Sequence, residues 1–461
     1  MDAIITALST SVLGTLRVLA ILLAGFFASR WPKSEPLLTK ETCRAFSRAC
    51  ALLFLPSLMI SSLGATLNPE ALVNSWQLVV AGSFTVALSG TVAWVVGRVF
   101  FRRPEDRRAF RPAGLAITFA NSAGFPLLLM NALCEQDYVR SDYNDDAVEC
   151  FTQATGMIFI YVVVWQMYFF GWGFYALGHD DTLERSLTGQ QTRTQTPSTK
   201  TRAAARAASS TSSARQEHGR IGRINAAEVV VIDIEPCAGE ESSSEGTTNA
   251  GGTGDGGDVS EGDPWAGFKE RVSRVLVSPN IISVTIGVII AMIPPLQEML
   301  FDNSRSMLRP LGAALQTVGT PEVAVSTLVM AGSLAQVPTM AAASTHGGQG
   351  DDAGTLRRKR RFRIIAGFLH VVCRLIVVPA IGFTLFWVAR NQSSVMGENR
   401  LMHLILLIEF AMPSAAFVIV SLNQLRMPAT AGFMARLYLW QYGASMLTIT
   451  AWTALAVNLV Y

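Results

Sequence analysis

Residues 116–134, "AITFANSAGFPLLLMNALC", have the length and apolar character of a membrane helix but are interrupted in the middle. Asn121, Ser122, Gly124 and Pro126 crowd into this central part, where a membrane helix should be most regular. In hydrocarbon no water can satisfy a freed backbone group, so a break is tolerated only where protein or a water-filled cavity satisfies it. The stretch therefore predicts a membrane helix that is broken at mid-depth beside a polar site.

The rest of the chain predicts an all-α polytopic membrane protein. Half of its 461 residues are hydrophobic and only 15% are charged. Apolar runs of about 20 residues, the length that a helix needs to cross a bilayer, recur on both sides of one polar stretch. The ten predicted spans are 8–29, 44–63, 76–100, 112–134, 151–176, 279–299, 312–337, 363–389, 401–422 and 432–460. The first is interpreted as a span because it lacks the basic start and the small-residue cleavage site of a signal peptide.

The polar stretch divides the chain into three predicted parts: a membrane half at 1–178, a linker at 179–272 and a second membrane half at 273–461. The linker is rich in Ser, Thr, Gly and charged residues, with one short apolar run, "EVVVIDIE" (228–235). Such a composition cannot bury enough apolar surface to offset its ordering entropy, so disorder is predicted. The net charge of +3 does not indicate nucleic-acid binding, because the Arg clusters lie between apolar runs.

Basic residues predict the orientation of the spans, because cytosolic loops carry an excess of Lys and Arg. The first, third and seventh connections are basic (residues 30–44, 98–111 and 357–363). The second connection has no Lys or Arg, and the fourth, residues 135–149, is acidic with Arg140 as its one basic residue. The odd connections and the long linker are therefore predicted to be cytosolic, with both termini on the opposite side.

Cys134 and Cys150 flank the acidic fourth connection. On the non-cytosolic side they could form a disulfide if that compartment is oxidising, or they could be two unrelated thiols. The six cysteines include no CxxC pair that would indicate a zinc site, and no metal or cofactor is expected.

The linker leaves five spans on each side, so the second half must cross the membrane with the opposite orientation to the first. That is the condition for an inverted repeat. The fourth span carries "NSAGFP" (121–126), and its counterpart, the ninth, carries "EFAMPS" (409–414). Two such breaks can meet at mid-membrane, where half-helix N-termini offer amides and positive dipole ends to an anion. The alternative is a pair of proline kinks with no binding role.

These motifs, together with "IGVIIAMIPPLQEMLF", "RLIVVPAIGF" and "LYLWQYGASMLTITAW", resemble the auxin efflux carrier superfamily, and most of all its PIN-likes branch of endoplasmic-reticulum carriers. The resemblance covers both membrane halves and omits the linker. It implies a bile-acid-transporter-like fold with two crossed, proline-broken helices. Spans one, two, six and seven would form a scaffold and dimer surface, and the other six spans would form the moving part.

The resemblance also implies a substrate class and some site residues. The substrate would be a small amphipathic carboxylate such as indole-3-acetate. Asn121 corresponds to the asparagine before the first crossing proline, and Pro413-Ser414 to the second crossing. The chain departs from the branch by having Gly124, Phe417 and Ser333 at positions where an asparagine is frequent, which leaves the substrate within that class open.

Two charged residues inside predicted spans add to the site. Glu409 lies four residues before Pro413, at a depth where an ionised carboxylate is costly, so it is either a proton-coupling group or a buried structural acid. Arg374 in the eighth span either balances a substrate carboxylate or makes a structural ion pair. The predicted substrate site comprises Asn121, Ser122, Gly124, Pro126, Glu409, Pro413, Ser414 and Arg374.

No catalytic motif such as a P-loop, HExxH or GxSxG is present, so the chain is not expected to be an enzyme. The leading prediction is a homodimeric secondary carrier that moves a small organic anion out of the cytosol, in the endoplasmic reticulum membrane more than in the plasma membrane. One alternative is a proton- or sodium-coupled carrier of another organic acid. A second alternative is a transporter-like receptor that signals through its cytosolic linker.

Overall fold

The structure is a computed structural model. It describes residues 16, 20–32, 36–67, 69, 76–178, 277–303, 305–335, 353–392 and 399–461. Chain contacts divide the protein into two units, 1–191 with 267–461 and 192–266, and all described residues belong to the first. The predicted linker and half of the first predicted span lie outside the described residues, so the division into three parts stays a prediction.

The described residues are helical almost throughout. In the first half the helices are α2 (Lys40–Ala49), η1 (Cys50–Phe54), α3 (Leu55–Thr66), α5 (Trp76–Phe100), α6 (Pro104–Thr118), α7 (Gly124–Cys134), α8 (Asp137–Arg140), α9 (Ala147–Tyr168), η3 (Phe169–Gly173) and α10 (Phe174–Gly178). In the second half they are α14 (Pro279–Met292), α15 (Pro294–Gln297), η4 (Glu298–Asp302), α16 (Arg309–Gly319), α17 (Glu322–Ala335), α19 (Ala353–Val372), η5 (Cys373–Val377), α20 (Val378–Gln392), α21 (Arg400–Ala411), α22 (Phe417–Gln424) and α23 (Pro428–Val460).

Six continuous helical stretches are long and apolar enough to cross a membrane: 40–66, 76–100, 147–178, 309–335, 360–391 and 428–460. The bent pair α14 and α15–η4 would make a seventh. Two further predicted spans, 112–134 and 401–422, are each divided between two shorter helices, α6 and α7 in one case and α21 and α22 in the other. The chain is therefore a polytopic helical membrane protein, and the ten-span repeat stays a prediction.

The sixth predicted span, 279–299, is bent near its C-terminal end. Its helix α14 ends at Met292, and the chain then turns by 108° into the segment Pro294–Asp302. Pro294 and Pro295 explain the turn, because a proline cannot donate the helical hydrogen bond and disfavours helix in the residue before it.

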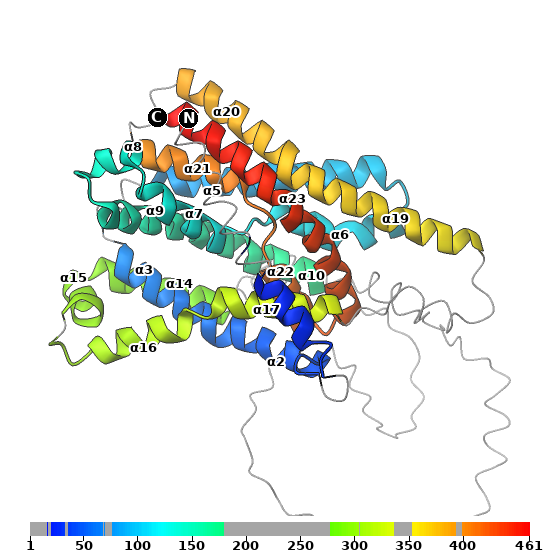
Figure 1. Cartoon of the computed structure of the whole chain (residues 1–461), viewed down its shortest axis with the longest axis horizontal. Coiled ribbons are helices and arrows are strands. Elements are labelled where there is room, and N and C mark those ends of the chain that lie inside the picture. The colour runs from blue at the N-terminus through cyan, green and yellow to red at the C-terminus, as the bar shows by residue number, and fades with distance from the viewer. Residues whose placement is uncertain are drawn as a thin grey trace, which may run out of the picture. The chain divides into compact units, whose positions relative to one another are not determined.

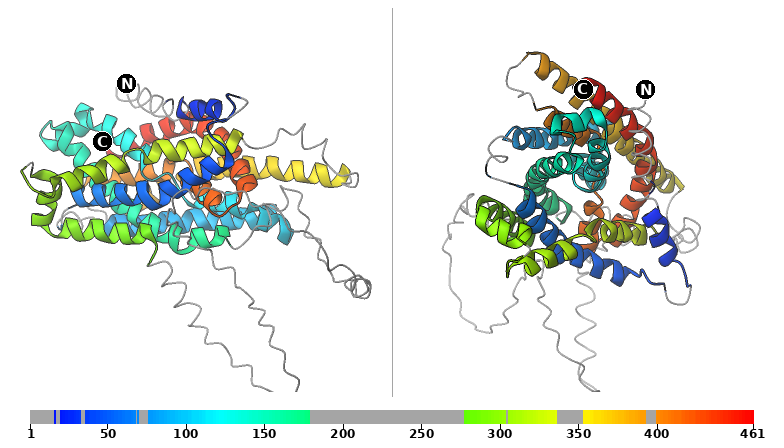
Figure 2. Two further views of the ribbon diagram at one scale, coloured as in Figure 1. Left: turned by 90° about the horizontal axis from the view of Figure 1, so that it is seen from below. Right: turned by 60° about the vertical axis from the view of Figure 1, so that its left-hand side comes forward.

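The helices gather in two groups. Figure 1 shows α2, α3, α14, α16 and α17 together on one side, and α5, α7, α9, α20, α21 and α23 on the other. Within the first group α3 packs mainly against α14 and α16, whereas α5 packs against α6 and α9. The N-terminal end of α19 extends beyond the neighbouring helices (Figure 2), and Arg358 there forms an ion pair of 2.9 Å with Asp106 of α6.

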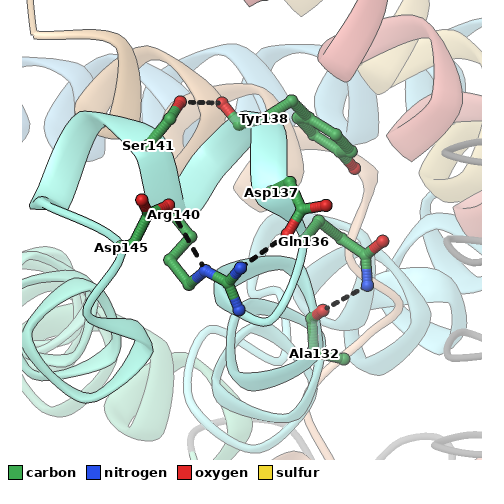
Figure 3. Close-up of polar contacts among 7 residues, drawn as sticks. All are labelled: Ala132, Gln136, Asp137, Tyr138, Arg140, Ser141 and Asp145. Atoms are coloured by element: carbon green, nitrogen blue, oxygen red, sulfur yellow. Dashed lines mark hydrogen bonds and ion pairs between the residues drawn. The ribbon is translucent and has the colours of Figure 1, made fainter.

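The acidic connection between α7 and α9 lies at the opposite end from the start of α19 (Figure 1). Cys134 and Cys150 are joined by a disulfide at its base, which resolves the two possibilities left open by the sequence. Within the loop the guanidinium of Arg140 contacts Asp137 at 2.6 Å and Asp145 at 3.6 Å (Figure 3). The loop is thus held both by a covalent bond and by ion pairs, although exposed pairs contribute little to stability.

Candidate functional site

The two broken helices cross and pair with each other at their breaks. Ala120 and Ser414 form an isolated antiparallel bridge. The amide of Asn121 donates to the carbonyl of Pro413 at 2.7 Å, and the amide of Ala415 donates to the carbonyl of Phe119 at 3.0 Å. The unwound backbone of one helix therefore satisfies that of the other, as a hydrocarbon environment requires.

Local sequence explains where each helix stops and restarts. Helix α6 ends at Thr118, and α7 begins at Gly124, so the break precedes Pro126. Pro126 lies in the first turn of α7, where its missing amide hydrogen costs nothing because first-turn amides have no helical partner. The Asn121 side-chain oxygen accepts from the Gly124 amide at 3.2 Å and so satisfies one of these amides.

Helix α23 holds the second break in place with three side chains on one face. Tyr438 donates to the carbonyl of Ala415 at 3.0 Å, and Tyr442 donates to the carbonyl of Ser414 at 3.0 Å. Between them, the amide nitrogen of Gln441 donates to the Ser414 hydroxyl at 3.0 Å. The Gln441 oxygen lies 3.1 Å from Nε2 of His370, and since this oxygen can only accept, Nε2 is the donor.

Arg374 lies beneath the crossing and joins the C-terminal ends of α6 and α21. It is fully buried and donates from Nε to the carbonyl of Met412 at 2.7 Å. Its Nη atoms reach the carbonyls of Ile117 at 3.3 Å and Glu409 at 3.4 Å, and the Ser89 hydroxyl at 3.3 Å. Helix C-termini carry partial negative charge, so one guanidinium here neutralises two helix ends.

A small cavity of about 70 Å³ lies on the other side of the crossing. Its lining includes residues 120–125 and 415–417, which contain the starts of both α7 and α22. Two helix N-termini with partial positive charge therefore border one space. The remaining wall comes from α3, α9, α17 and Tyr442, and much of it is apolar: Leu55, Leu58, Met59, Val162, Trp165 and Val323.

The predicted site residues divide into two sets in the structure. Asn121, Ser122 and Gly124 line the cavity. Pro126, Pro413 and Ser414 shape the crossing without lining it, and Arg374 and Glu409 lie behind it.

Glu409 is fully buried in α21. Its carboxylate has the Ser122 hydroxyl and the Arg374 guanidinium as polar neighbours. Neither of its oxygens makes a hydrogen bond of regular geometry with another described residue. The carboxylate is therefore enclosed just behind the residues that line the cavity.

Sequence reasoning missed one charged residue of the cavity wall. Glu322, the first residue of α17, lines the cavity and is only 8% exposed. It faces the same space as Asn121, although the two come from different halves of the chain. Glu409 was predicted to belong to the site because it is a carboxylate inside an apolar span. Glu322 has the same property, since it lies inside the predicted span 312–337, and it could have been found in the same way. Within the described ranges, no three His, Cys, Asp or Glu side chains are close enough to hold a metal ion.

A comparison with known protein families identifies the family of the chain. The family model described as "Membrane transport protein" matches residues 11–453, which is nearly the whole chain. A comparison with curated proteins gave no match. The chain carries several membrane-crossing helices and the matched region includes both broken helices. The protein therefore belongs to the membrane transport protein family, that of the auxin efflux carriers, and is a transporter and not an enzyme.

Proposed function

We propose that this protein is a secondary carrier that moves a small amphipathic organic anion, such as indole-3-acetate, by alternating access. The observation that carries the proposal is the convergence of two helix N-termini on one cavity beside Asn121. Amide hydrogens and positive dipole ends at such a point favour a carboxylate. Asn121, Ser122 and Gly124 would bind the anionic group.

The rest of the cavity suits the apolar part of such a substrate. Aliphatic and aromatic side chains from α3, α7 and α9, among them Met59, Phe125 and Trp165, form most of the wall. Binding sites for small amphipathic molecules combine this kind of wall with a few polar groups. A free volume of about 70 Å³ holds only a few water molecules, so the helices around it must separate to admit an aromatic acid.

That separation fits the division of the helices into two groups. The cavity lies between α3 and α17 of one group and α7, α9 and α23 of the other. We infer an inverted repeat of ten spans, in which spans one, two, six and seven form the scaffold and dimer surface and the crossing moves with the other spans. In this arrangement the basic connections and the linker face the cytosol, both termini face the other side, and the membrane is that of the endoplasmic reticulum.

Flux measurements on the full-length protein in proteoliposomes test the proposal. Radiolabelled indole-3-acetate should enter in a saturable manner, and other aromatic carboxylates should compete with it. The uncharged amide of the same acid should not compete, because the two helix N-termini select a negative charge. A folded protein that carries none of these anions, or that does not distinguish the acid from its amide, would contradict the assignment.

The position of Glu322 supports a second candidate, an ion-coupled carrier. A buried carboxylate on the cavity wall, with a second one at Glu409 behind it, can hold a proton or sodium ion next to an anionic substrate. Glu409 is the one carboxylate that the sequence analysis placed at the site, and Glu322 adds a second. Glu322→Gln should then abolish the effect of a proton or sodium gradient on flux while leaving exchange of the anion intact. Glu298→Gln, at an exposed position, is the matched control.

A further inference from the structure

A second and much larger cavity lies away from the crossing. It has a volume of about 690 Å³ and is bordered by α5, α6 and the end of the fifth span at η3 and α10. It shares no lining residue with the cavity at the crossing. The proposed transport function does not use it.

The mouth of this cavity is strongly basic. Four arginines line it, Arg98 from α5 and Arg107, Arg108 and Arg111 from α6, and the lining contains no Asp or Glu. The two nearest acidic residues in the sequence, Glu105 and Asp106, are engaged elsewhere, since Arg358 of α19 lies 3.8 Å and 2.9 Å from them. A guanidinium is the side chain best suited to pair with a phosphate oxygen.

Aromatic rings accompany the arginines at this end. The Arg98 guanidinium lies over the ring of Trp94 at 5.3 Å, and Trp172 and Tyr175 line the same cavity. Trp and Tyr are enriched at the level of lipid headgroups, where one part of the ring is apolar and the other is hydrated. The mouth therefore lies at the depth where phospholipid phosphates are found.

Several small residues line the inner part of the cavity, together with Phe110 and Leu115. Gly90, Ala93 and Gly97 lie on one face of α5, and Gly114 faces them from α6. From Arg98 to Gly90 the helix rises about 12 Å, at roughly 1.5 Å per residue. Half of the hydrocarbon core is about 15 Å thick. The groove thus runs from the headgroup level nearly to the middle of the membrane and ends at Thr118, the last residue of α6.

We propose that this cavity binds one anionic phospholipid, with its phosphate between the arginines and one acyl chain in the groove of small residues. Basic pockets between membrane helices are suited to anionic headgroups, and the glycine face gives an acyl chain access that larger side chains would deny. The bound lipid contacts α6 along its length, including the turn that leads into the crossing at Phe119. Its occupancy would therefore hold the first half-helix in position.

Lipid retention by the full-length protein tests this site. The protein is reconstituted into phosphatidylcholine vesicles with increasing shares of phosphatidylglycerol, and the lipid that it retains is counted by native mass spectrometry. The wild type should retain one phosphatidylglycerol. Arg98→Gln/Arg108→Gln removes two exposed arginines and should raise the phosphatidylglycerol share for half-saturation about 25-fold, at roughly fivefold per arginine.

A charge-matched control is available on α19. Arg360→Gln/Arg361→Gln removes the same charge from exposed positions outside the cavity and should leave retention unchanged. Equal effects of the two double variants would overturn the proposal, because general attraction to the membrane surface would then explain the binding.

A third variant separates a lipid from a free phosphate. Gly97→Leu places a larger side chain on the inner wall of the cavity and keeps every arginine; a Cβ at Gly97 meets the Phe110 ring of α6 at 3.5 Å. It should abolish lipid retention. If Gly97→Leu retains the lipid normally, or if soluble glycerol phosphate displaces the lipid completely, the site is one for phosphate alone and the lipid assignment is wrong.

Discussion

The backbone amide of Asn121 donates a 2.7 Å hydrogen bond to the carbonyl of Pro413, which joins the break in one membrane helix to the break in another. The return bond from Ala415 to Phe119 completes an isolated antiparallel bridge between the two breaks. Each break alone would leave buried polar groups without partners, at a cost of several kcal/mol. Together the breaks stabilise each other, and both helix N-termini stay available to a ligand.

Replacement of Asn121 by alanine should reduce anion flux per molecule at least tenfold. The side-chain oxygen that satisfies the Gly124 amide is lost, and so is the amide group that lies 3.5 Å from the Tyr442 hydroxyl and borders the cavity. The backbone bond to Pro413 remains, so the fold and membrane abundance should be unchanged. Flux into proteoliposomes, normalised to protein amount, measures the effect.

Asn458→Ala is the control for this substitution. Asn458 is an exposed residue of α23 whose side chain donates only to the carbonyl of Ala454. Flux of this variant should equal that of the wild type. Equal flux per molecule for Asn121→Ala would remove Asn121 from the binding site.

Replacement of Arg374 by methionine should destabilise the protein by roughly 3 kcal/mol or more, because four buried acceptors lose a charged donor. Thermal unfolding in detergent measures the change. Arg374→Lys, which keeps the charge but not the fork of donors, should recover part of the loss. Full stability of the methionine variant would show that the guanidinium is not needed to hold the helix ends.

Local sequence rules were sufficient to find the broken helices. Asn121, Gly124 and Pro126 in one span and Pro413 in another are unfavourable in a membrane helix, and the structure places both breaks within a few residues of them. The predicted spans 76–100 and 432–460 likewise match α5 and α23 closely, because a long apolar run between polar ends specifies a helix without help from distant residues.

Contacts between distant segments could not be predicted in the same way. The spacing of the polar residues Tyr438, Gln441 and Tyr442 places them on one face of α23. The sequence alone does not indicate that this face contacts the break at Ser414. Arg374 was correctly selected as an unusual buried charge. Three of its four acceptors are backbone carbonyls, which every residue has, so their identity depends on how α6 and α21 pack around the guanidinium.

Replacement of Glu409 by glutamine should flatten the pH dependence of anion flux. The change keeps the size of the side chain but replaces the carboxylate, which can bind and release a proton, with an amide, which cannot. The carboxylate is fully buried beside Ser122, which lines the cavity, so its protonation can respond to the bound anion. Flux measured across a range of pH values decides the matter, with the exposed Glu41→Gln as control. A profile that persists in Glu409→Gln would make Glu409 a structural acid.

Reduction of the disulfide between Cys134 and Cys150 should lower the stability of the protein by roughly 3 kcal/mol, the entropy effect expected for a loop of about 15 residues. The bond ties the end of α7 to the start of α9. Because α7 begins at the crossing, loosening its far end should also reduce anion flux. Thermal unfolding and flux, each with and without a reductant, measure both effects.

The double variant Cys134→Ser/Cys150→Ser is the control, since a reductant should change neither its unfolding temperature nor its flux. An equal response of the wild type and the double variant to the reductant would show that the effect does not come from the bond between Cys134 and Cys150.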